Sequence, residues 1–414
     1  MRRVALLTGV AFALRLALAL AVPRSLGAFN DEIFYHHAAD TLAHGDGFRA
    51  ITGGPMAQWP PGYSFVLSLV YLVTGAKPAA GQVLNAVFCA LTVPLLFILV
   101  RRVLGRREAW PAAGALAVLP GQILWSDVLI AETFYAFLLV AFFVLAAWLP
   151  DRPWSALALG VAVGVLTLTR GEGLLLVPVA IAIWWPELPR GRLAARTGLL
   201  LAAAVLTVAP WTIRNAVVMD AFIPVSSNAS ITFYSGHNPR ADGAQNFAPA
   251  YLNRGLPAFG PRREVEQAKL LRRKGLEFME HHPGRELELI PLKLFNLGRG
   301  DWHAMEWVNA PDKQGARPIA GKLDAPIRVL ADGTYYVLLA ATLVSLFLFR
   351  RELWRLRIVR GVLVLFAATL VMYGFVYYGN FRYRAPLEPL MLLVAAPLLV
   401  RIWDLRSSAG IAPP

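Results

Sequence analysis

The sequence predicts an all-α polytopic membrane protein, and two observations support this fold class. First, 57% of its 414 residues are hydrophobic and only 16% are charged, whereas a soluble domain carries about 25% charged residues. Second, the apolar residues gather in runs that approach the ~20 residues a helix needs to cross a bilayer. About ten such runs follow one another, at residues 4–22, 81–100, 111–128, 131–149, 154–169, 173–186, 197–213, 334–349, 359–378 and 386–402.

The first run, 4–22, resembles a secretory signal peptide at its ends. Its length exceeds the ~7–15 apolar residues of a cleaved signal, so we expect it to remain as a transmembrane helix. Arg15 lies inside this run, and a cation at that depth is expected to face protein rather than lipid. The single cysteine, Cys89, lies in the second run, which excludes a disulfide within the chain and gives no basis for redox chemistry.

The net charge of +14 arises mainly in the connections between the apolar runs. Lys and Arg gather at every second connection, at residues 2–3, 101–107, 190–196, 350–360 and 401–406. Cytoplasmic loops carry such an excess of Lys and Arg. We therefore predict a multi-pass protein of the cell (cytoplasmic) membrane with both termini in the cytoplasm, and we expect no binding to nucleic acid.

Three parts are expected in chain order, at residues 1–213, 214–333 and 334–414. The first is a transmembrane module whose first outer loop holds interfacial helices. The second is too long for a plain loop and is expected to be an extracytoplasmic or interfacial segment, with amphipathic helices at 262–282 and 286–297. The third supplies the last transmembrane helices and a cytoplasmic tail.

The first outer loop, 23–80, begins with a helical pattern that runs from Asp31 to Ala43. Asn30 or Asp31 can cap this helix by accepting a hydrogen bond from a free backbone N–H group, and Gly45 ends it. Later in the loop, the apolar stretch 63–75 is too short to cross a bilayer. It is therefore expected to be an interfacial or re-entrant helix.

Adjacent carboxylates directly after a membrane span need an explanation, and Asp31 and Glu32 are such a pair. Helical spacing places Asp31 on the face of Tyr35 and Glu32 on the face of His36. One interpretation is a helix N-terminus with a solvated neighbour. The other is a catalytic carboxylate that takes a proton from a hydroxyl group. Whether His36, with Glu32 and Glu132, holds a divalent metal ion stays open.

The last outer connection carries Arg382 and Arg384 among the aromatic residues Tyr378 and Tyr383. Two cations on the extracytoplasmic side depart from the usual distribution of positive charge. Because a guanidinium group binds phosphate through two parallel hydrogen bonds, we interpret this stretch as a phosphate-binding site rather than a membrane anchor.

Four further residues of the outer connections each have two interpretations. Glu132 either complements a helix dipole or belongs to a site. Arg170 either extends to the membrane surface or pairs with Glu172, and Arg214 either anchors its helix at the interface or binds a substrate. Tyr63, after the rigid turn of two prolines, either lines a pocket or only begins the interfacial helix. All of these fall on one side of the membrane, so we expect one shared site there.

Taken together, the chain resembles the C-type membrane glycosyltransferases, specifically the glycosyltransferase family 39 group with its protein O-mannosyltransferases and bacterial aminoarabinose transferases. The short motifs that carry the resemblance run in order through nearly the whole chain. They are Asp31-Glu32 with Tyr35, Pro60-Pro61-Gly62-Tyr63, Ala131-Glu132-Thr133, Leu168-Thr169-Arg170, Pro210-Trp211-Thr212-Ile213-Arg214-Asn215, Gly236-His237-Asn238-Pro239, His282-Pro283, and Arg382-Tyr383-Arg384 with Pro386. His237 departs from the pattern, since an amide is expected there, and the chain lacks the length of members with large C-terminal domains.

The resemblance implies a polyprenyl-phosphate-linked sugar as donor, transfer with inversion, and a site where the membrane meets the extracytoplasmic space. It implies Asp31 as the base on the acceptor hydroxyl, with Glu32 and Glu132 shaping the site or binding a metal. Arg382 and Arg384 would hold the lipid phosphate. The remaining substrate-binding residues would be Tyr35, Tyr63, Arg170, Arg214, Tyr378 and Tyr383.

The proposed chemistry agrees with this resemblance. A polyprenyl phosphate leaves with growing negative charge, which fixed cations stabilise, and the sugar–phosphate bond supplies the energy, so no nucleotide cofactor is expected. The acceptor, whether a protein, a lipid or a glycan, stays unknown. The alternative is a transporter or flippase for a lipid-linked substrate. It would place polar residues deep in the spans and show an internal repeat, and the sequence shows no clear repeat.

Overall fold

The computed structural model describes residues 2–22, 24, 26, 31–150, 152–246, 252, 255–257, 259–311, 317, 319 and 321–408. Within these ranges the regular structure is helical, and the β-type pairing is limited to an isolated bridge between Arg49 and Pro55. The prediction of an all-α fold is therefore confirmed.

Seven helices of the described ranges are long and apolar enough to cross a bilayer. They are α1 (Arg2–Ala21), α4 (Pro78–Val103), α7 (Ala131–Trp148), α10 (Arg190–Met219), α15 (Gly321–Arg355), α16 (Arg357–Val371) continued by η3 (Met372–Val376), and α17 (Phe381–Arg384) continued through η4 (Ala385–Leu387) by α18 (Glu388–Ser408). Shorter apolar helices are α3 (Gly62–Thr74), α8 (Pro153–Thr169) and η1 (Gly171–Leu175) with α9 (Leu176–Trp184). A multi-pass membrane protein is confirmed, whereas a count of about ten crossings stays a prediction.

One expected span is broken in the structure. The apolar run 111–128 forms two helices, α5 (Arg106–Val118) and α6 (Pro120–Asp127). Leu119 between them is extended, with φ −65° and ψ 114°. The residue before a proline is disfavoured in the helical region because the proline ring collides with its backbone. Pro120 therefore ends the first helix and begins the second.

The first outer loop folds as its sequence pattern predicts. Helix α2 (Asp31–Ala43) has the expected bounds, and Gly45 follows it with a φ of +82°, a conformation that favours glycine. The expected short apolar helix is α3. Asn30, one of the two expected caps, lies outside the described residues.

The long segment 214–333 also holds the expected amphipathic helices. They are α12 (Pro261–His281) and α13 (Pro283–Gly298), which begins a few residues earlier than predicted because Pro283 occupies its first position, where a proline is tolerated. Two shorter helices flank them, α11 (Asn228–Gly236) and α14 (Trp302–Val308).

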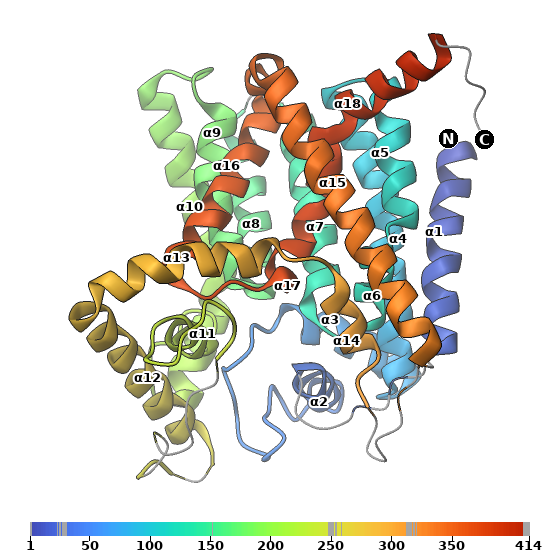
Figure 1. Cartoon of the computed structure of the whole chain (residues 1–414). Helices are drawn as coiled ribbons and strands as arrows, with labels where there is room; N and C mark the ends of the chain where they lie inside the picture. The colour runs from blue at the N-terminus through green and yellow to red at the C-terminus, as the bar shows by residue number, and fades with distance from the viewer. Residues whose placement is uncertain are drawn as a thin grey trace.

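The connections separate into two ends of the helical bundle (Figure 1). Helices α2, α11 and α12 lie at one end, which we call the loop end. The turn between α15 and α16, the start of α1 and the end of α18 lie at the other end, which we call the basic end because the arginine-rich connections fall there. This separation follows the alternation of basic loops in the sequence. Which end faces the cytoplasm stays a prediction.

Arg15 confirms the expectation that it faces protein. Its side chain is buried, and its guanidinium group donates hydrogen bonds to the carbonyl oxygens of Ala11 and Ala117 at 2.8 Å and of Leu116 at 3.2 Å. Its Nε lies 2.9 Å from Cys89 Sγ. The charge is thus satisfied by backbone oxygens, which ties α1 to α4 and α5 inside the bundle.

Candidate active site

Asp31 and Arg382 are 351 positions apart in the chain, yet they form an ion pair at the loop end. Arg382 Nη1 donates a hydrogen bond to Asp31 Oδ2 at 2.6 Å, and Arg382 Nε donates to Glu132. Asp31 is the first residue of α2, and Arg382 lies on the short helix α17, whose start is capped by Asn380. The first and last outer connections therefore converge, as the sequence leads one to expect.

The ion pairs continue from Glu132, the second residue of α7, into a chain of charges. Arg170 donates to the same Glu132 oxygen that Arg382 uses. Its Nη2 lies 2.5 Å from Glu172 Oε1, which also accepts a hydrogen bond from the Tyr373 hydroxyl. Arg170 is therefore paired rather than extended to the membrane surface.

The two carboxylates that bind Arg382 differ in solvent exposure. Asp31 keeps 32% of its side chain exposed, whereas Glu132 keeps 1%. Glu132 Oε2 is buried and has no hydrogen-bond partner among the described residues. Two guanidinium groups compensate the buried charge of Glu132. Asp31, by contrast, is the carboxylate that an external hydroxyl group can approach.

Arg382 also keeps hydrogen-bonding capacity. A guanidinium group has five N–H donors, and Arg382 Nη2 makes no hydrogen bond to the described part of the chain. Its carbon Cζ lies 5.1 Å from the centre of the Trp307 ring, which supports the planar group from one face. Arg382 is thus held in place by Asp31, Glu132 and Trp307 while two of its N–H groups remain available.

Tyr378 and Tyr383 lie beside these charges. Their hydroxyl groups are 2.5 Å apart, and the Tyr383 ring stacks on Tyr373 with centroids 4.5 Å apart. Arg170 lies over the Tyr383 ring at 5.4 Å. Burial raises the pKa of Tyr378 to about 12, so this hydroxyl group stays protonated at neutral pH and can donate a hydrogen bond.

Tyr35 and Tyr63 pack between α2 and α3. Their rings meet edge to face at 5.4 Å, and Ser64 Oγ donates to the backbone oxygen of Tyr35 at 3.1 Å. Burial and then the nearby charges of Glu132 and Asp31 raise the pKa of Tyr35 far above its usual range. Tyr35 therefore lies against the chain of charges, whereas Tyr63 is fully buried behind it.

Glu32 occupies a different place from the one expected beside Asp31. Arg24 Nη2 contacts Glu32 Oε2 at 2.5 Å, and the backbone N–H group of Leu129 donates to Glu32 Oε1 at 2.9 Å. The side chain is buried, and Asp127 lies close to the same Arg24. Neighbouring positions in a helix point about 100° apart, so one carboxylate faces Arg382 and the other faces Arg24. A catalytic or metal-binding role for Glu32 is therefore not retained.

The expected metal set does not form in this structure. His36 Nδ1 lies 2.7 Å from the Tyr71 hydroxyl on α3, and Glu32 and Glu132 are engaged by arginines. Within the described ranges, no three His, Cys, Asp or Glu side chains come together as metal ligands would. His36 instead helps to hold α2 on α3.

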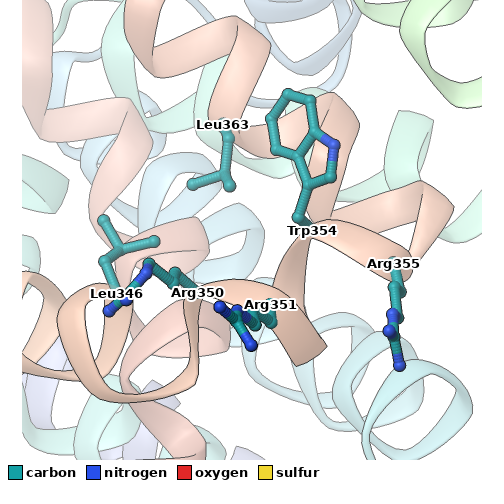
Figure 2. Close-up of a pocket in the computed structure, with 6 residues that line it drawn as sticks. All are labelled: Leu346, Arg350, Arg351, Trp354, Arg355 and Leu363. Carbon is teal, nitrogen blue, oxygen red and sulfur yellow. The ribbon is translucent and has the colours of Figure 1, made fainter.

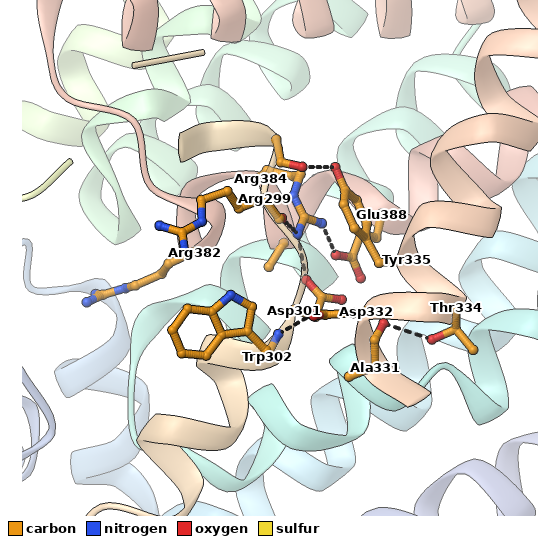
Figure 3. Close-up of polar contacts among 12 residues, drawn as sticks. Arg299, Asp301, Trp302, Ala331, Asp332, Thr334, Tyr335, Arg382, Arg384 and Glu388 are labelled. Carbon is orange, nitrogen blue, oxygen red and sulfur yellow. Dashed lines mark hydrogen bonds and ion pairs between the residues drawn. The ribbon is translucent and has the colours of Figure 1, made fainter. Parts of the chain in front are cut away.

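Arg384 also departs from its expected role. Its guanidinium group lies 2.6 Å from Asp301 Oδ1 and 2.5 Å from Glu388 Oε1, and it covers the Tyr335 ring with Cζ 3.4 Å from the centroid (Figure 3). It also donates to the carbonyl oxygens of Leu297 and Arg299. With these partners it is buried and uses four of its five N–H donors inside the protein, so it joins α18 to the segment before α14 and is poorly placed to hold a phosphate.

Arg214 is likewise used within the protein. Its guanidinium group donates to the backbone oxygens of Met56 at 2.6 Å and Phe48 at 2.8 Å. It lies over the Trp211 ring at 4.7 Å. Arg214 therefore ties the first outer loop to the end of α10, and the expected substrate contact is not retained.

His237, which departs from the family pattern, positions the last outer connection. Its Nε2 lies 3.0 Å from the carbonyl oxygen of Val376, and its Nδ1 lies 2.8 Å from Glu286 Oε2. Next to it, a Cβ atom on Gly236 would lie 2.6 Å from the Tyr377 oxygen, so only glycine allows this approach. Both residues hold the backbone that leads to Arg382.

Two aromatic residues of the site were not predicted from the sequence. Trp307 comes from α14, a short helix without a clear pattern, and Tyr373 lies inside an apolar run, where it resembles a core residue. Tyr373 could have been found, because a tyrosine hydroxyl buried near the end of a span needs a polar partner.

Comparisons with known proteins give one family model and several solved structures of similar fold. Residues 58–213 match the family model described as dolichyl-phosphate-mannose-protein mannosyltransferase. The oligosaccharyltransferase of Archaeoglobus fulgidus in complex with Zn and sulfate is similar in fold, with a TM-score of 0.52 at 15% identity, covering 97% of this chain and 50% of that chain. The same enzyme with an inhibitory peptide and a dolichol-phosphate gives a TM-score of 0.52 at 15% identity, covering 99% and 52%.

A bacterial enzyme is similar to a lesser degree. ArnT from Cupriavidus metallidurans, bound to undecaprenyl phosphate, gives a TM-score of 0.46 at 16% identity, covering 90% of this chain and 76% of that chain. From the coverages of 50% and 52%, the present chain spans about half the length of the archaeal oligosaccharyltransferase. No curated protein sequence matches the chain significantly.

The family model matches residues 58–213, and the likeness to the archaeal oligosaccharyltransferase, at 15% identity, is a likeness of fold. The matched model, that of the dolichyl-phosphate-mannose-protein mannosyltransferases, agrees with the resemblance that the motifs in the sequence carry. The matched stretch, 58–213, contains three of the predicted site residues, Tyr63, Glu132 and Arg170.

Proposed function

We propose that the protein transfers a sugar from a polyprenyl-phosphate donor to a hydroxyl group of an acceptor, with inversion at the sugar carbon C1. The observation that carries this proposal is the contact of Asp31 with Arg382 at 2.6 Å. It sets a solvent-accessible carboxylate beside a guanidinium group in a chain related to glycosyltransferases. Such a pair supplies a base and a phosphate-binding cation within one site.

In the proposed reaction, Asp31 takes the proton of the acceptor hydroxyl group while the oxygen of that hydroxyl group attacks the sugar carbon C1. The bond between C1 and the phosphate oxygen breaks, and its electron pair stays on the lipid phosphate. Arg382 binds this phosphate through the N–H groups of Nη2, where negative charge grows as the bond breaks. Glu132 and Arg170 keep Arg382 oriented, and Tyr378 and Tyr383 offer hydroxyl groups to the sugar.

The proposed setting is a cell membrane, with both termini in the cytoplasm and the loop end on the extracytoplasmic side. The lipid donor would approach from the bilayer, and the acceptor from the aqueous phase. The presence of a lipid phosphate and a peptide in one solved relative supports a lipid-linked donor and a separate acceptor. The acceptor of this chain, whether protein, lipid or glycan, is left open.

A divalent metal ion would assist the departure of the phosphate if it were bound, and the archaeal relative was solved with Zn. The residues near Asp31 fit such an ion poorly, because Glu132 is shared by two arginines and Glu32 is held by Arg24. No step of the proposed reaction therefore passes through a metal.

The transporter alternative receives less support. It needs polar groups exposed along a path through the spans. Arg15, the buried cation of α1, already donates to three carbonyl oxygens and lies against Cys89. Four of its five N–H donors are therefore used within the protein, and its buried side chain is not exposed along a path through the spans.

The decisive experiment replaces Asp31 by Asn, which keeps the shape of the side chain and removes its basicity. In membranes supplied with a radiolabelled polyprenyl-phosphate sugar, we expect the rate of sugar transfer to fall by about 100-fold or more, the usual contribution of a general base. Donor binding should persist, because Arg382 keeps its contact with Glu132.

Asp40→Asn is the matched control. It is the same chemical change on the same helix, at a residue that pairs with His44 and lies away from Arg382. We expect it to leave the transfer rate unchanged. If Asp31→Asn turned over at the rate of the unmodified protein, Asp31 could not be the base.

A further inference from the structure

The basic end of the bundle contains a pocket that the proposed reaction does not use. Helix α15 bends at Phe349, where the backbone leaves helical geometry with φ −112° and ψ 18°. Residues on both sides of this bend, together with Leu363 of α16, line an open pocket of about 470 Å³. Its lining residues are Leu346, Arg350, Arg351, Trp354, Arg355 and Leu363 (Figure 2).

The arginines of this pocket lack acidic partners. Within the described part of the chain, Arg351 and Arg355 make no hydrogen bond or ion pair, and Arg350 donates only to the carbonyl oxygen of Phe347, at 3.0 Å. Two other arginines at this end do have acidic partners: Arg360 contacts Glu187 at 2.9 Å, and Arg107 pairs with Asp404. Glu352 lies in the same segment, but within the described residues it forms no ion pair with these arginines. An anion beside their guanidinium groups would therefore be stabilising.

The rest of the lining is apolar or amphipathic. Leu346 lies on α15 just before the bend and Leu363 lies on α16, and Figure 2 shows Leu363 across from the arginine-bearing segment. Trp354 is about half exposed. Indole side chains favour the level of the lipid headgroups, where one part of the ring meets hydrocarbon and the other meets water.

We propose that this pocket binds the phosphate-bearing headgroup of an anionic lipid. The phosphate would sit among Arg350, Arg351 and Arg355, and the upper part of the acyl chains would lie against the two leucines. Guanidinium groups suit this ligand because their paired N–H groups match two phosphate oxygens. The inference is independent of the sugar-transfer reaction, since the pocket lies at the end of the bundle away from Asp31.

The competing explanation is a plain excess of positive charge, which cytoplasmic loops carry without any specific ligand. A matched pair of variants separates the two explanations. Arg351→Gln with Arg355→Gln removes two charges from the pocket, and Arg190→Gln with Arg192→Gln removes two exposed charges from the start of α10 at the same end. The net charge of the two double variants is identical.

The experiment uses the purified full chain in detergent and counts bound lipids by native mass spectrometry. The probes are dioleoylphosphatidylglycerol, dioleoylphosphatidylcholine and inorganic phosphate. We expect the anionic lipid to bind in preference to the zwitterionic one, and the Arg351/Arg355 variant to weaken its binding by about tenfold or more. The Arg190/Arg192 variant should bind like the unmodified protein.

Three outcomes would overturn the proposal. Equal weakening in both double variants would mean a diffuse charge effect, and unchanged binding in the Arg351/Arg355 variant would exclude the pocket. Displacement of the lipid by millimolar inorganic phosphate, with no preference for the lipid, would assign the site to a soluble phosphate instead. As a check on folding, Arg351→Lys with Arg355→Lys keeps both charges and should retain part of the affinity, because lysine lacks the planar pair of donors.

Discussion

At the scale of single residues, the arginines of this protein differ by their partners rather than by their surroundings in sequence. Arg384 has two carboxylate partners inside the protein, whereas Arg214 binds mainly backbone oxygens. Arg382 is held by two carboxylates but keeps a free amino group. The arrangement around Arg382 leaves a whole amino group for a substrate, so the proposed phosphate site contains one of the two arginines expected there.

His36 offers a prediction about pH at the same scale. Burial lowers the pKa of His36 below its ordinary value of 6.5, against the opposing charge of Asp40. The unfolded chain therefore takes up a proton as the pH falls through about 6.5, and the folded chain does so only at a lower pH. Above that range the folded protein has the full benefit of the neutral contact with Tyr71, and stability is lost progressively as the pH falls.

His36→Gln should remove part of this pH dependence. We expect the difference in thermal unfolding temperature between about pH 7.5 and about pH 5 to be smaller in the variant than in the unmodified protein, as measured by tryptophan fluorescence in detergent. His44→Gln is the control, because His44 is exposed and directly follows the same helix. An equal pH dependence in His36→Gln and the unmodified protein would contradict the buried neutral histidine.

At the scale of elements, close helix packing depends on particular small residues. Helices α8 and α10 approach each other at Gly160 and Gly164, four residues apart on one face of α8. A Cβ atom on Gly160 would lie 2.3 Å from the backbone oxygen of Leu200, and one on Gly164 would lie 2.5 Å from Thr207 Cβ. Small residues at this spacing let two backbones approach closely inside a bilayer.

Gly160→Ala should therefore destabilise the protein by about 1–3 kcal/mol, the usual cost of overpacking, because a backbone oxygen cannot move aside easily. Gly198→Ala on α10 is the control, since a Cβ atom there meets nothing within 4 Å. An exposed glycine in a helix gains up to about 1 kcal/mol on substitution by alanine. Thermal unfolding in detergent measures the stability change of each variant. Equal stability of Gly160→Ala and Gly198→Ala would refute the close approach of α8 and α10.

At the scale of the whole molecule, the two ends of the bundle have different proposed tasks. The loop end brings together α2, α7, α14 and α17 around the Asp31–Arg382 pair. The basic end carries the arginine-rich turns and the lipid-binding pocket that we propose. Sugar transfer outside the cell requires the loop end to face outward.

Cysteine labelling tests this orientation. Cys89, the single cysteine of the chain, is buried, so an added cysteine reports its own accessibility. We expect a membrane-impermeant maleimide to label Arg262→Cys on α12 in intact cells, and to label Ser407→Cys at the end of α18 only after permeabilisation. The unmodified protein is the background control. The reverse pattern would place the proposed active site in the cytoplasm.

The sequence by itself allowed much of the helical framework to be predicted. The bounds of α2, the amphipathic helices of the long segment and most apolar runs follow from periodicity and from Gly and Pro positions, which act over a few residues. The break at Pro120 has the same local cause but was not predicted. Asp31 and Arg382 were also recognisable, because charges at the ends of membrane spans are costly and stand out.

Only the tertiary structure decided which charges meet. Glu32 and Asp31 are neighbours in sequence, yet one pairs with Arg24 and the other with Arg382, 351 positions from Asp31. A residue type determines the charge a side chain carries, whereas its partner depends on the packing of helices that are distant in sequence. In a medium of low polarity each buried charge must find an opposite one nearby, so the three-dimensional arrangement, and not the local pattern, separates the catalytic candidates from the internal ties.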